Sequence, residues 1–191
     1  MSQTLYEKAL IFATRKHSGQ ARKVFPVPYI CHPVHVSSIL YEMGCRDENI
    51  LSAALLHDTL EDTQTTYEEL DKEFNPVVAD LVKELTNTAE AKQDKVAYTK
   101  KRFNEMTPQA CLIKSADMLS NFKDIVLSKD KLPQGEFITA LNTIAQRVCH
   151  AKSKMGDLLD CIKDDDLRKL LRAMRCLLGN QLNDSMHLSM H

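Results

Sequence analysis

The stretch that most constrains this 191-residue chain covers residues 50–63 and reads ILSAALLHDTLEDT. Its first seven residues are apolar or small and include no helix breaker, which predicts a buried helix. Four ionisable side chains follow within six residues, namely His57, Asp58, Glu61 and Asp62. Burying such groups is costly unless their desolvation is offset, and a divalent cation does this well. We therefore expect a metal-binding helix here, with a solvated helix end as the alternative.

The spacing of the four polar residues assigns them to two pairs. If the helix runs on to about Glu61 or Asp62, residues four apart lie one turn above one another. His57 would then neighbour Glu61, and Asp58 would neighbour Asp62. In such an arrangement one side chain can bind a ligand while the next takes part in a reaction.

The segment GQARKVFPVPYICHP, upstream of this helix, contains one glycine and three prolines and is predicted to be a loop. It concentrates side chains that bind ligands, namely Arg22, Lys23, Tyr29 and His32. His32 precedes Pro33, and proline suits the first position of a helix, so a second helix should begin there. By residue type alone, His17 and His35 are no less eligible as ligands than His32.

A second informative stretch covers residues 108–126 and reads PQACLIKSADMLSNFKDIV. Its apolar positions predict a buried helix, on which Lys114, Asp117 and Asn121 form one stripe. Asp117 in so apolar a helix needs either a cation or Lys114 to offset its burial. A structural Lys114–Asp117 ion pair without any function is therefore the alternative.

The remaining segments also show helical spacing, and no strand-like alternation is present, so the expected fold class is all-α. Two amphipathic helices, over about residues 136–155 and 158–178, are assigned to the scaffold. The run of three aspartates at 164–166 is typical of a helix start. We expect a single domain over residues 1–178 and a mobile tail over residues 179–191.

The composition bounds the partners and the compartment. A formal net charge of −1 leaves no general attraction for a nucleic-acid polymer. The chain has no run of eighteen apolar residues and no signal-like leader, so no membrane partner is expected. Its six cysteines show no CxxC spacing, which favours reduced thiols and a cytoplasmic location. Nothing in the sequence indicates the oligomeric state.

Taken together, a loop histidine, a His-Asp pair and a later helical aspartate resemble the signature of the HD-domain phosphohydrolases. The segments GQARK and PYICHP, LLHDTLEDT, and KSADMLSN further resemble the hydrolase motifs of the RelA/SpoT family, over roughly residues 5–126. The resemblance implies an HD-domain helical bundle. It also implies a stand-alone small alarmone hydrolase, similar to the metazoan SpoT homologues, that removes the 3′-pyrophosphate from guanosine tetra- or pentaphosphate.

The same resemblance implies a role for each motif residue. The ligands of one Mn²⁺ ion would be His32, His57, Asp58 and Asp117. Glu61 and Asp62 would act on the attacking water. Arg22 and Lys23 would neutralise phosphate charge, and Asn121 would contact the ribose or orient a ligand. Two imidazoles and two carboxylates suit a six-coordinate metal such as Mn²⁺ and differ from the thiolate set of structural zinc.

Three other functions stay open at this point. The substrate could be another phosphorylated nucleotide, such as an adenosine analogue or a phosphorylated dinucleotide. The chain could also be a catalytically silent nucleotide sensor or a partner-binding helical module. Where relatives commonly carry a tyrosine near the nucleotide, the nearest residue here is Phe137, which can stack on a base but donates no hydrogen bond.

Overall fold

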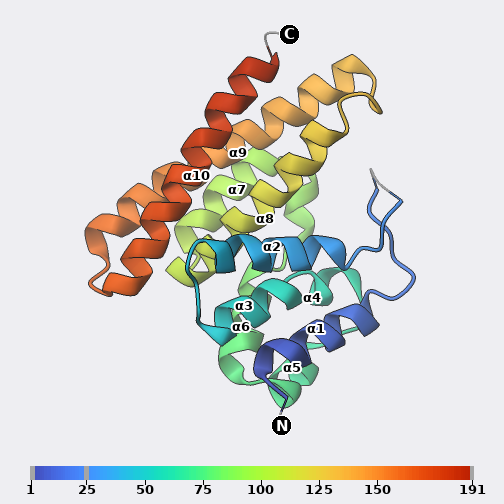
Figure 1. Cartoon of the computed structure of the whole chain (residues 1–191), viewed down its shortest axis with the longest axis vertical. Helices are drawn as coiled ribbons and strands as arrows, with labels where there is room; N and C mark the ends of the chain where they lie inside the picture. The colour runs from blue at the N-terminus through green and yellow to red at the C-terminus, as the bar shows by residue number, and fades with distance from the viewer. Residues whose placement is uncertain (1–2, 24–25, 190–191) are drawn as a thin grey trace. The chain divides into compact units, whose positions relative to one another are not determined.

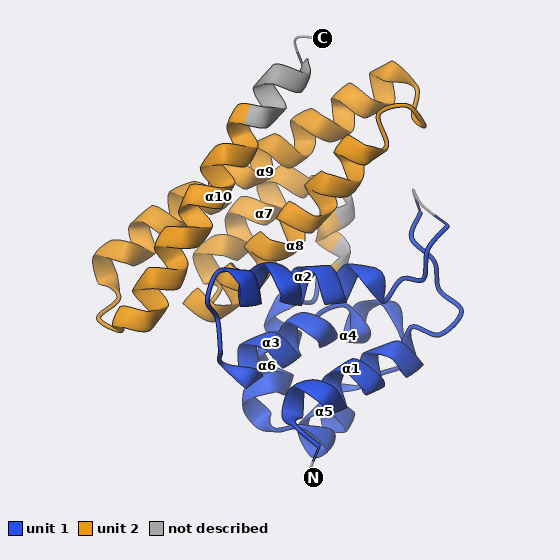
Figure 2. Ribbon diagram, viewed as in Figure 1, with its two compact units in different colours: residues 1–87 blue, residues 88–191 orange. Residues whose placement is uncertain are grey.

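The computed structural model describes residues 3–23 and 26–189, and its side chains are described up to Asn183 except at residues 89 and 92. Helices make up the regular structure of this part of the chain, and its only β feature is an isolated bridge between Ala21 and Pro28. The predicted all-α class is therefore confirmed. The chain divides into two compact units, Met1–Asn87 and Thr88–His191 (Figures 1 and 2). No helix in the described ranges combines the length and apolarity needed to cross a membrane.

Unit 1 is organised around helix α3. Its helices are α1 (Leu5–Lys16), α2 (Cys31–Glu42), α3 (Glu48–Leu56), α4 (Thr59–Asp62), α5 (Tyr67–Glu73) and α6 (Pro76–Leu85). Helix α3 packs against α1, α2 and α6, and its residues 50–56 are all buried. Asp47 starts this helix by accepting hydrogen bonds from two backbone N–H groups of its first turn. The apolar run that predicted a core helix therefore fixes the centre of unit 1.

Unit 2 is organised around the long helix α9. It contains the 3₁₀ turn η1 (Ala89–Lys92) and the helices α7 (Lys95–Glu105), α8 (Pro108–Leu127), α9 (Gln134–Cys161) and α10 (Asp165–Ser189). Helix α9 packs against α7, α8 and α10. Thr107 caps α8 by accepting a hydrogen bond from the backbone N–H of Ala110, and Pro108 occupies the first turn.

Two predicted helix boundaries in unit 1 are wrong. Helix α3 ends at Leu56, His57 and Asp58 form a turn, and α4 begins at Thr59, so the expected continuous helix is broken at the two polar residues. Helix α2 begins at Cys31, two residues before Pro33, because Pro33 is tolerated within the first turn, where backbone N–H groups have no helical partner.

Helix boundaries in unit 2 also differ from prediction. Helix α9 continues through Gly156 to Cys161, because an isolated glycine weakens a helix without ending it. The aspartates at 164–166 do begin a helix, since the Asp164 carboxylate accepts a hydrogen bond from the backbone N–H of Leu167. Helix α10 then passes Gly179 and reaches Ser189. The single domain with a mobile tail stays a prediction, and the side chains of His187 and His191 lie outside the described residues.

Candidate functional site

At the break between α3 and α4, a hydrogen bond to the backbone orients the imidazole ring of His57. His57 is 2% exposed, and its Nδ1 lies 2.9 Å from the backbone oxygen of Ala54. Ala54 belongs to the last turn of α3, where carbonyl groups lack a helical donor. Because a carbonyl oxygen can only accept, Nδ1 carries the hydrogen. In its neutral form the ring would then present the lone pair of Nε2, which is the form that binds a metal.

The carboxylate of Asp58 lies between the two histidines of unit 1. Its Oδ2 is 3.0 Å from Nε2 of His57 and 3.8 Å from Nε2 of His32. His32 is 4% exposed and lies in the first turn of α2, and the two imidazole rings are 5.2 Å apart between centroids. At 3.0 Å, either a proton or a metal cation on Nε2 can join the His57 ring to the Asp58 carboxylate. The donor set of unit 1 therefore fits a metal cation.

Tyr29 holds the Asp58 carboxylate from the other side. Its hydroxyl donates a hydrogen bond of 2.6 Å to Asp58 Oδ2. Burial, together with the charge of Asp58, raises the pKa of Tyr29, so the phenol keeps its proton and remains a donor. The Tyr29 ring also contacts His17, with centroids 4.8 Å apart, and the guanidinium of Arg22 lies 5.5 Å from its centre. Sequence reasoning missed this role, although Tyr29 lies only three residues before His32.

The two predicted catalytic carboxylates lie on α4 and are exposed, unlike the buried histidines. Glu61 Oε2 accepts two hydrogen bonds from Asn87, one from the backbone N–H at 3.0 Å and one from the side-chain amide at 2.9 Å. The backbone oxygen of Asp62 accepts a hydrogen bond of 2.7 Å from the side chain of Gln20. No local pattern in the sequence pairs Asn87 with Glu61.

The basic loop of unit 1 is described in part. Arg22 is half-buried beside Tyr29, whereas Lys23 is exposed. The next two residues, Val24 and Phe25, lie outside the described residues. His17 is 3% exposed and its Nδ1 lies 2.8 Å from Gln20 Oε1, so it packs behind Tyr29. The structure thus distinguishes the two histidines as candidate ligands, because His32 lies near the Asp58 carboxylate and His17 packs against the Tyr29 ring. Residue type alone could not distinguish them.

In unit 2, the three residues of the predicted stripe on α8 are in contact. Asp117 is 5% exposed, and its Oδ2 lies 3.0 Å from Nζ of Lys114. Asn121 donates a hydrogen bond of 2.5 Å to the other carboxylate oxygen. The ion pair given above as the structural alternative is therefore present. It does not exclude a second cation, because a carboxylate has four lone-pair sites.

A further cation near Asp117 comes from α9, which the sequence had assigned to the scaffold. Arg147 donates through Nε to the Thr99 hydroxyl at 2.9 Å. Burial lowers the pKa of Arg147, and the negative charge of Asp117 opposes this shift. Phe137, also on α9, is only 4% exposed. Its ring therefore belongs to the core of unit 2, which leaves little surface for stacking a nucleotide base.

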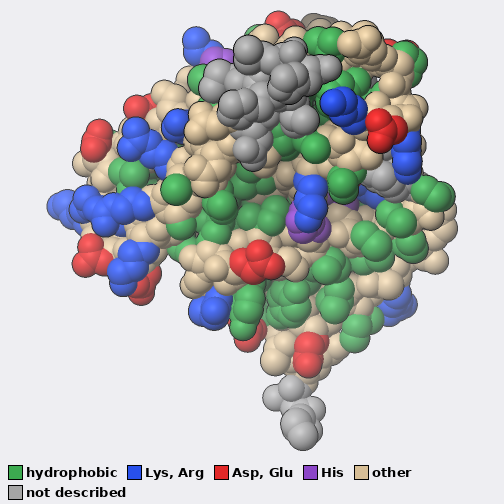
Figure 3. Space-filling model, turned by 45° about the horizontal axis from the view of Figure 1, so that its top comes forward, with side chains coloured by type: hydrophobic (Ala, Val, Ile, Leu, Met, Phe, Trp, Pro, Cys, Tyr) green, Lys and Arg blue, Asp and Glu red, His purple; other side chains and the backbone are tan. Residues whose placement is uncertain are grey.

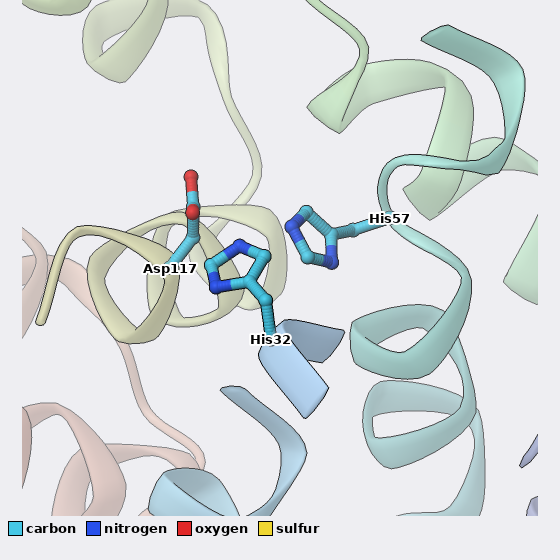
Figure 4. A group of neighbouring side chains, drawn as sticks. All are labelled: His32, His57 and Asp117. Carbon is cyan, nitrogen blue, oxygen red and sulfur yellow. The ribbon is translucent and has the colours of Figure 1, made fainter. Parts of the chain in front are cut away.

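Three of the four predicted metal ligands are fully buried. His32 comes from the first turn of α2, His57 from the end of α3, and Asp117 from α8, and each offers one ligand atom (Figure 4). Together with Asp58, they supply nitrogen and oxygen donors without a thiolate. This is a donor set for a borderline or hard divalent cation.

Comparison with known proteins identifies the family. Residues 9–134 match the HD domain. The chain is 41% identical over 121 residues to the human guanosine-3′,5′-bis(diphosphate) 3′-pyrophosphohydrolase MESH1, covering 62% of this chain and 68% of that protein. It is 40% identical over 129 residues to the guanosine-3′,5′-bis(diphosphate) 3′-pyrophosphohydrolase of Aquifex aeolicus, covering 65% of this chain but 18% of that protein.

A solved structure supports the same relationship. It is the structure of a metazoan orthologue of SpoT that hydrolyses ppGpp and plays a role in starvation responses. The two chains are 28% identical and align with a TM-score of 0.72 over 94% of this chain and 98% of the other. This chain therefore belongs to the HD domain family.

Proposed function

We propose that this protein is a metal-dependent hydrolase of guanosine 3′,5′-bis(diphosphate) that releases pyrophosphate from the 3′ position. The observation that carries the proposal is the convergence of His32, His57 and Asp58 in unit 1, with distances of 3.0 and 3.8 Å between the ring nitrogens and the carboxylate. The activity for which the human and Aquifex relatives are named supports the choice of substrate.

We further propose that Asp117 completes the ligand set of His32, His57 and Asp58 and that the metal is Mn²⁺. All four positions match the H…HD…D signature of the family, and Asp117 is a buried carboxylate held by Lys114 and Asn121. Mn²⁺ accepts mixed nitrogen and oxygen ligands and leaves coordination positions open in such a set. When bound, a divalent ion supplies positive charge that polarises phosphate oxygens and makes water a better nucleophile near neutral pH.

In this proposal Glu61 and Asp62 accept the proton of the attacking water. Both carboxylates are exposed, so water and substrate can reach them, and Asn87 holds Glu61 in one orientation. Water adds to the phosphorus bonded to the 3′-oxygen, and one of its protons passes to a carboxylate of α4. The bond between this phosphorus and the 3′-oxygen breaks, and the 3′-oxygen takes the proton back from the carboxylate and leaves as a hydroxyl group.

Arg22, Lys23 and Asn121 are proposed as substrate contacts. Arg22 is fixed against the Tyr29 ring, and Tyr29 in turn holds Asp58, so one aromatic side chain links the metal ligands to a cation. Arg22 and Lys23 would neutralise the diphosphate groups. Asn121 would contact the ribose or keep the Asp117 carboxylate oriented, as its 2.5 Å hydrogen bond to Asp117 permits.

One experiment tests the reaction and the metal together. The purified protein is stripped with a chelator, reloaded with Mn²⁺, Zn²⁺ or Mg²⁺, and incubated with guanosine 3′,5′-bis(diphosphate), its adenosine analogue and a nucleoside 3′-phosphate. We expect pyrophosphate release from the guanosine substrate, with Mn²⁺ the most effective ion. Absence of turnover by every metal form, together with measurable nucleotide binding, would identify a silent sensor instead.

A further inference from the structure

A groove lies between α9 and α10 of unit 2, which run side by side in Figure 1. Its volume is about 440 Å³, which is within the range of small-molecule sites. The groove lies beyond residue 134, where the match to the HD domain ends. Its lining consists of Lys152, Leu159, Arg172, Arg175, Cys176, Gly179, Asn180 and Asn183.

The charged residues of this lining are all cations. Lys152, Arg172 and Arg175 line the groove, and no carboxylate among the described residues does. Residues 167–183 of α10 contain four Lys or Arg residues and no Asp or Glu. Elsewhere the two signs are mixed, as on the face shown in Figure 3, where Lys and Arg side chains lie among Asp and Glu. The groove is thus a local concentration of positive charge on a chain of net charge −1.

These three cations form no ion pair within the part of the chain that the structure describes. Neither Lys152, Arg172 nor Arg175 forms an ion pair or side-chain hydrogen bond among those residues. Lys169 lies one helical turn before Arg172 on α10. Unlike the three cations of the groove, it forms an ion pair, with Asp166 at 3.1 Å. Like charges crowded along one groove repel one another, so an anion bound between them would relieve that repulsion.

Two glycines leave room for cationic side chains of the opposite helix. A Cβ atom added to Gly156 of α9 would lie 3.6 Å from Cζ of Arg175 on α10. A Cβ atom added to Gly179 of α10 would lie 3.2 Å from Nζ of Lys152 on α9. Each of these cations therefore rests over a glycine of the opposite helix. The absence of a Cβ atom at each glycine leaves room for these charged groups.

We propose that this groove binds a small molecule through a diphosphate or longer polyphosphate group. Arginine matches phosphate geometry with two parallel hydrogen bonds, and Lys152 adds a compact positive charge opposite. Asn180 and Asn183 bring amide donors to the same groove. The site is distinct in sequence from the metal-ligating residues. It stands whether or not the proposed hydrolase activity does.

Cys176 gives this proposal a local readout, because it is exposed and lines the groove. The full-length protein, in a buffer with chelator, is alkylated with iodoacetamide, and each cysteine is followed by peptide mass spectrometry. Cys149, also exposed but outside the lining, is the internal control. At ten times the dissociation constant of inorganic pyrophosphate we expect Cys176 to react roughly tenfold more slowly, since only the free fraction reacts, and Cys149 to be unchanged.

Matched variants decide whether the cations are responsible. Arg175→Gln should raise the half-protecting pyrophosphate concentration by about tenfold or more, because a charge-assisted hydrogen bond is lost. Lys169→Gln removes the same charge from α10 outside the groove and should leave protection intact. Circular dichroism melting checks that both variants fold.

Three outcomes would overturn the proposal. The first is no protection of Cys176 by pyrophosphate. The second is equal slowing of Cys149, or equal slowing by sodium chloride at matched ionic strength, because either would be general screening. The third is unchanged protection in Arg175→Gln. GDP is tested in parallel, and protection by GDP at a lower concentration than pyrophosphate would extend the site to a nucleoside diphosphate.

Discussion

Units 1 and 2 bury ionisable groups in two different ways. Unit 1 places His57 and Asp58 where one helix ends and another begins. Unit 2 places Asp117 in the middle of α8, an unbroken helix of 20 residues. At the break, a backbone carbonyl of the last turn is available to orient His57. Within the unbroken helix the backbone is already used, so side chains must orient and compensate Asp117, and Lys114 and Asn121 do so.

The difference teaches that the two groups depend on different partners. The Nδ1 side of the His57 ring is oriented by the local backbone, so removal of the ring should affect ligand binding more than folding. Removal of Asp117 instead leaves Lys114 without its counter-charge at a buried position. Loss of function and loss of stability should therefore separate in unit 1 and coincide in unit 2.

The largest effect is expected from His57→Ala. The variant should lose the metal and lower kcat/KM by on the order of 10³ or more, while its melting temperature stays close to that of the parent. Mass spectrometry measures the metal content, and the release of pyrophosphate measures kcat/KM. His35→Ala, a half-buried histidine of the neighbouring helix α2, is the control and should keep metal and activity. Full metal occupancy in His57→Ala would rule out its role as a ligand.

Asp117→Ala tests the contrast directly. It should lose the metal and also lower the free energy of unfolding by about 3–5 kcal/mol, because Lys114 is left buried and unpaired. The double variant Lys114→Met/Asp117→Leu should recover most of the stability in urea unfolding but none of the metal. If Asp117→Ala is as stable as the parent, the Lys114 pair contributes little and the contrast fails.

Glu61→Gln should lower kcat by on the order of 10² while metal content stays unchanged. The amide keeps the size of the side chain but cannot take a proton from water. Steady-state kinetics with parallel metal analysis tests the prediction. Loss of the metal in this variant would make Glu61 a ligand, contrary to the assignment.

Tyr29→Phe should weaken metal affinity by roughly 10- to 100-fold, because groups that hold a ligand in place typically contribute that much. The variant removes only the hydroxyl that donates to Asp58 and retains the ring beside Arg22. Tyr67→Phe is a matched control, since its hydroxyl donates to Asp80 on the exposed surface of unit 1. Competition with a chelating dye measures affinity, and equal losses in both variants would contradict the prediction.

The smallest effect concerns the substrate. Arg22→Ala should raise KM for every polyphosphorylated nucleotide by about tenfold, since it removes one charge-assisted contact. Preference for guanine over adenine should also be modest, ~10-fold or about 1.4 kcal/mol. Rejection of the adenine analogue by several orders of magnitude would show that a base-reading donor has been overlooked.

Local sequence patterns predicted many of the helices. The apolar run of α3, its Asp47 cap, and the Thr107 and Pro108 start of α8 each specify structure within a few residues, so the sequence predicted these helices. The break at His57 and Asp58 escaped prediction, because neither residue is a helix breaker and the turn is selected by tertiary contacts. The same holds for the continuation of α9 through Gly156.

The candidate site was predictable where its residues form motifs and unpredictable where partners come from distant segments. Lys114 and Asp117 are near neighbours on one helix, so their spacing predicted contact. The expected pairing of His57 with Glu61 assumed a continuous helix, whereas His57 contacts Asp58 across the break. The contacts of Tyr29 with Asp58 and of Glu61 with Asn87 join residues 29 and 26 positions apart. Such contacts depend on how helices pack, which periodicity along one helix does not reveal.

The hydrogen bonds of Asn87 have a mechanical consequence. Asn87 is the last residue of unit 1 and holds Glu61, while Thr88, the first residue of unit 2, donates its backbone N–H to the Tyr98 hydroxyl at 2.9 Å. Two consecutive residues thus form hydrogen bonds within different units. Only one peptide linkage lies between them. A rotation of the backbone at this linkage would strain one of these hydrogen bonds. The orientation of Glu61, the proposed proton acceptor, therefore depends on the backbone conformation between Asn87 and Thr88.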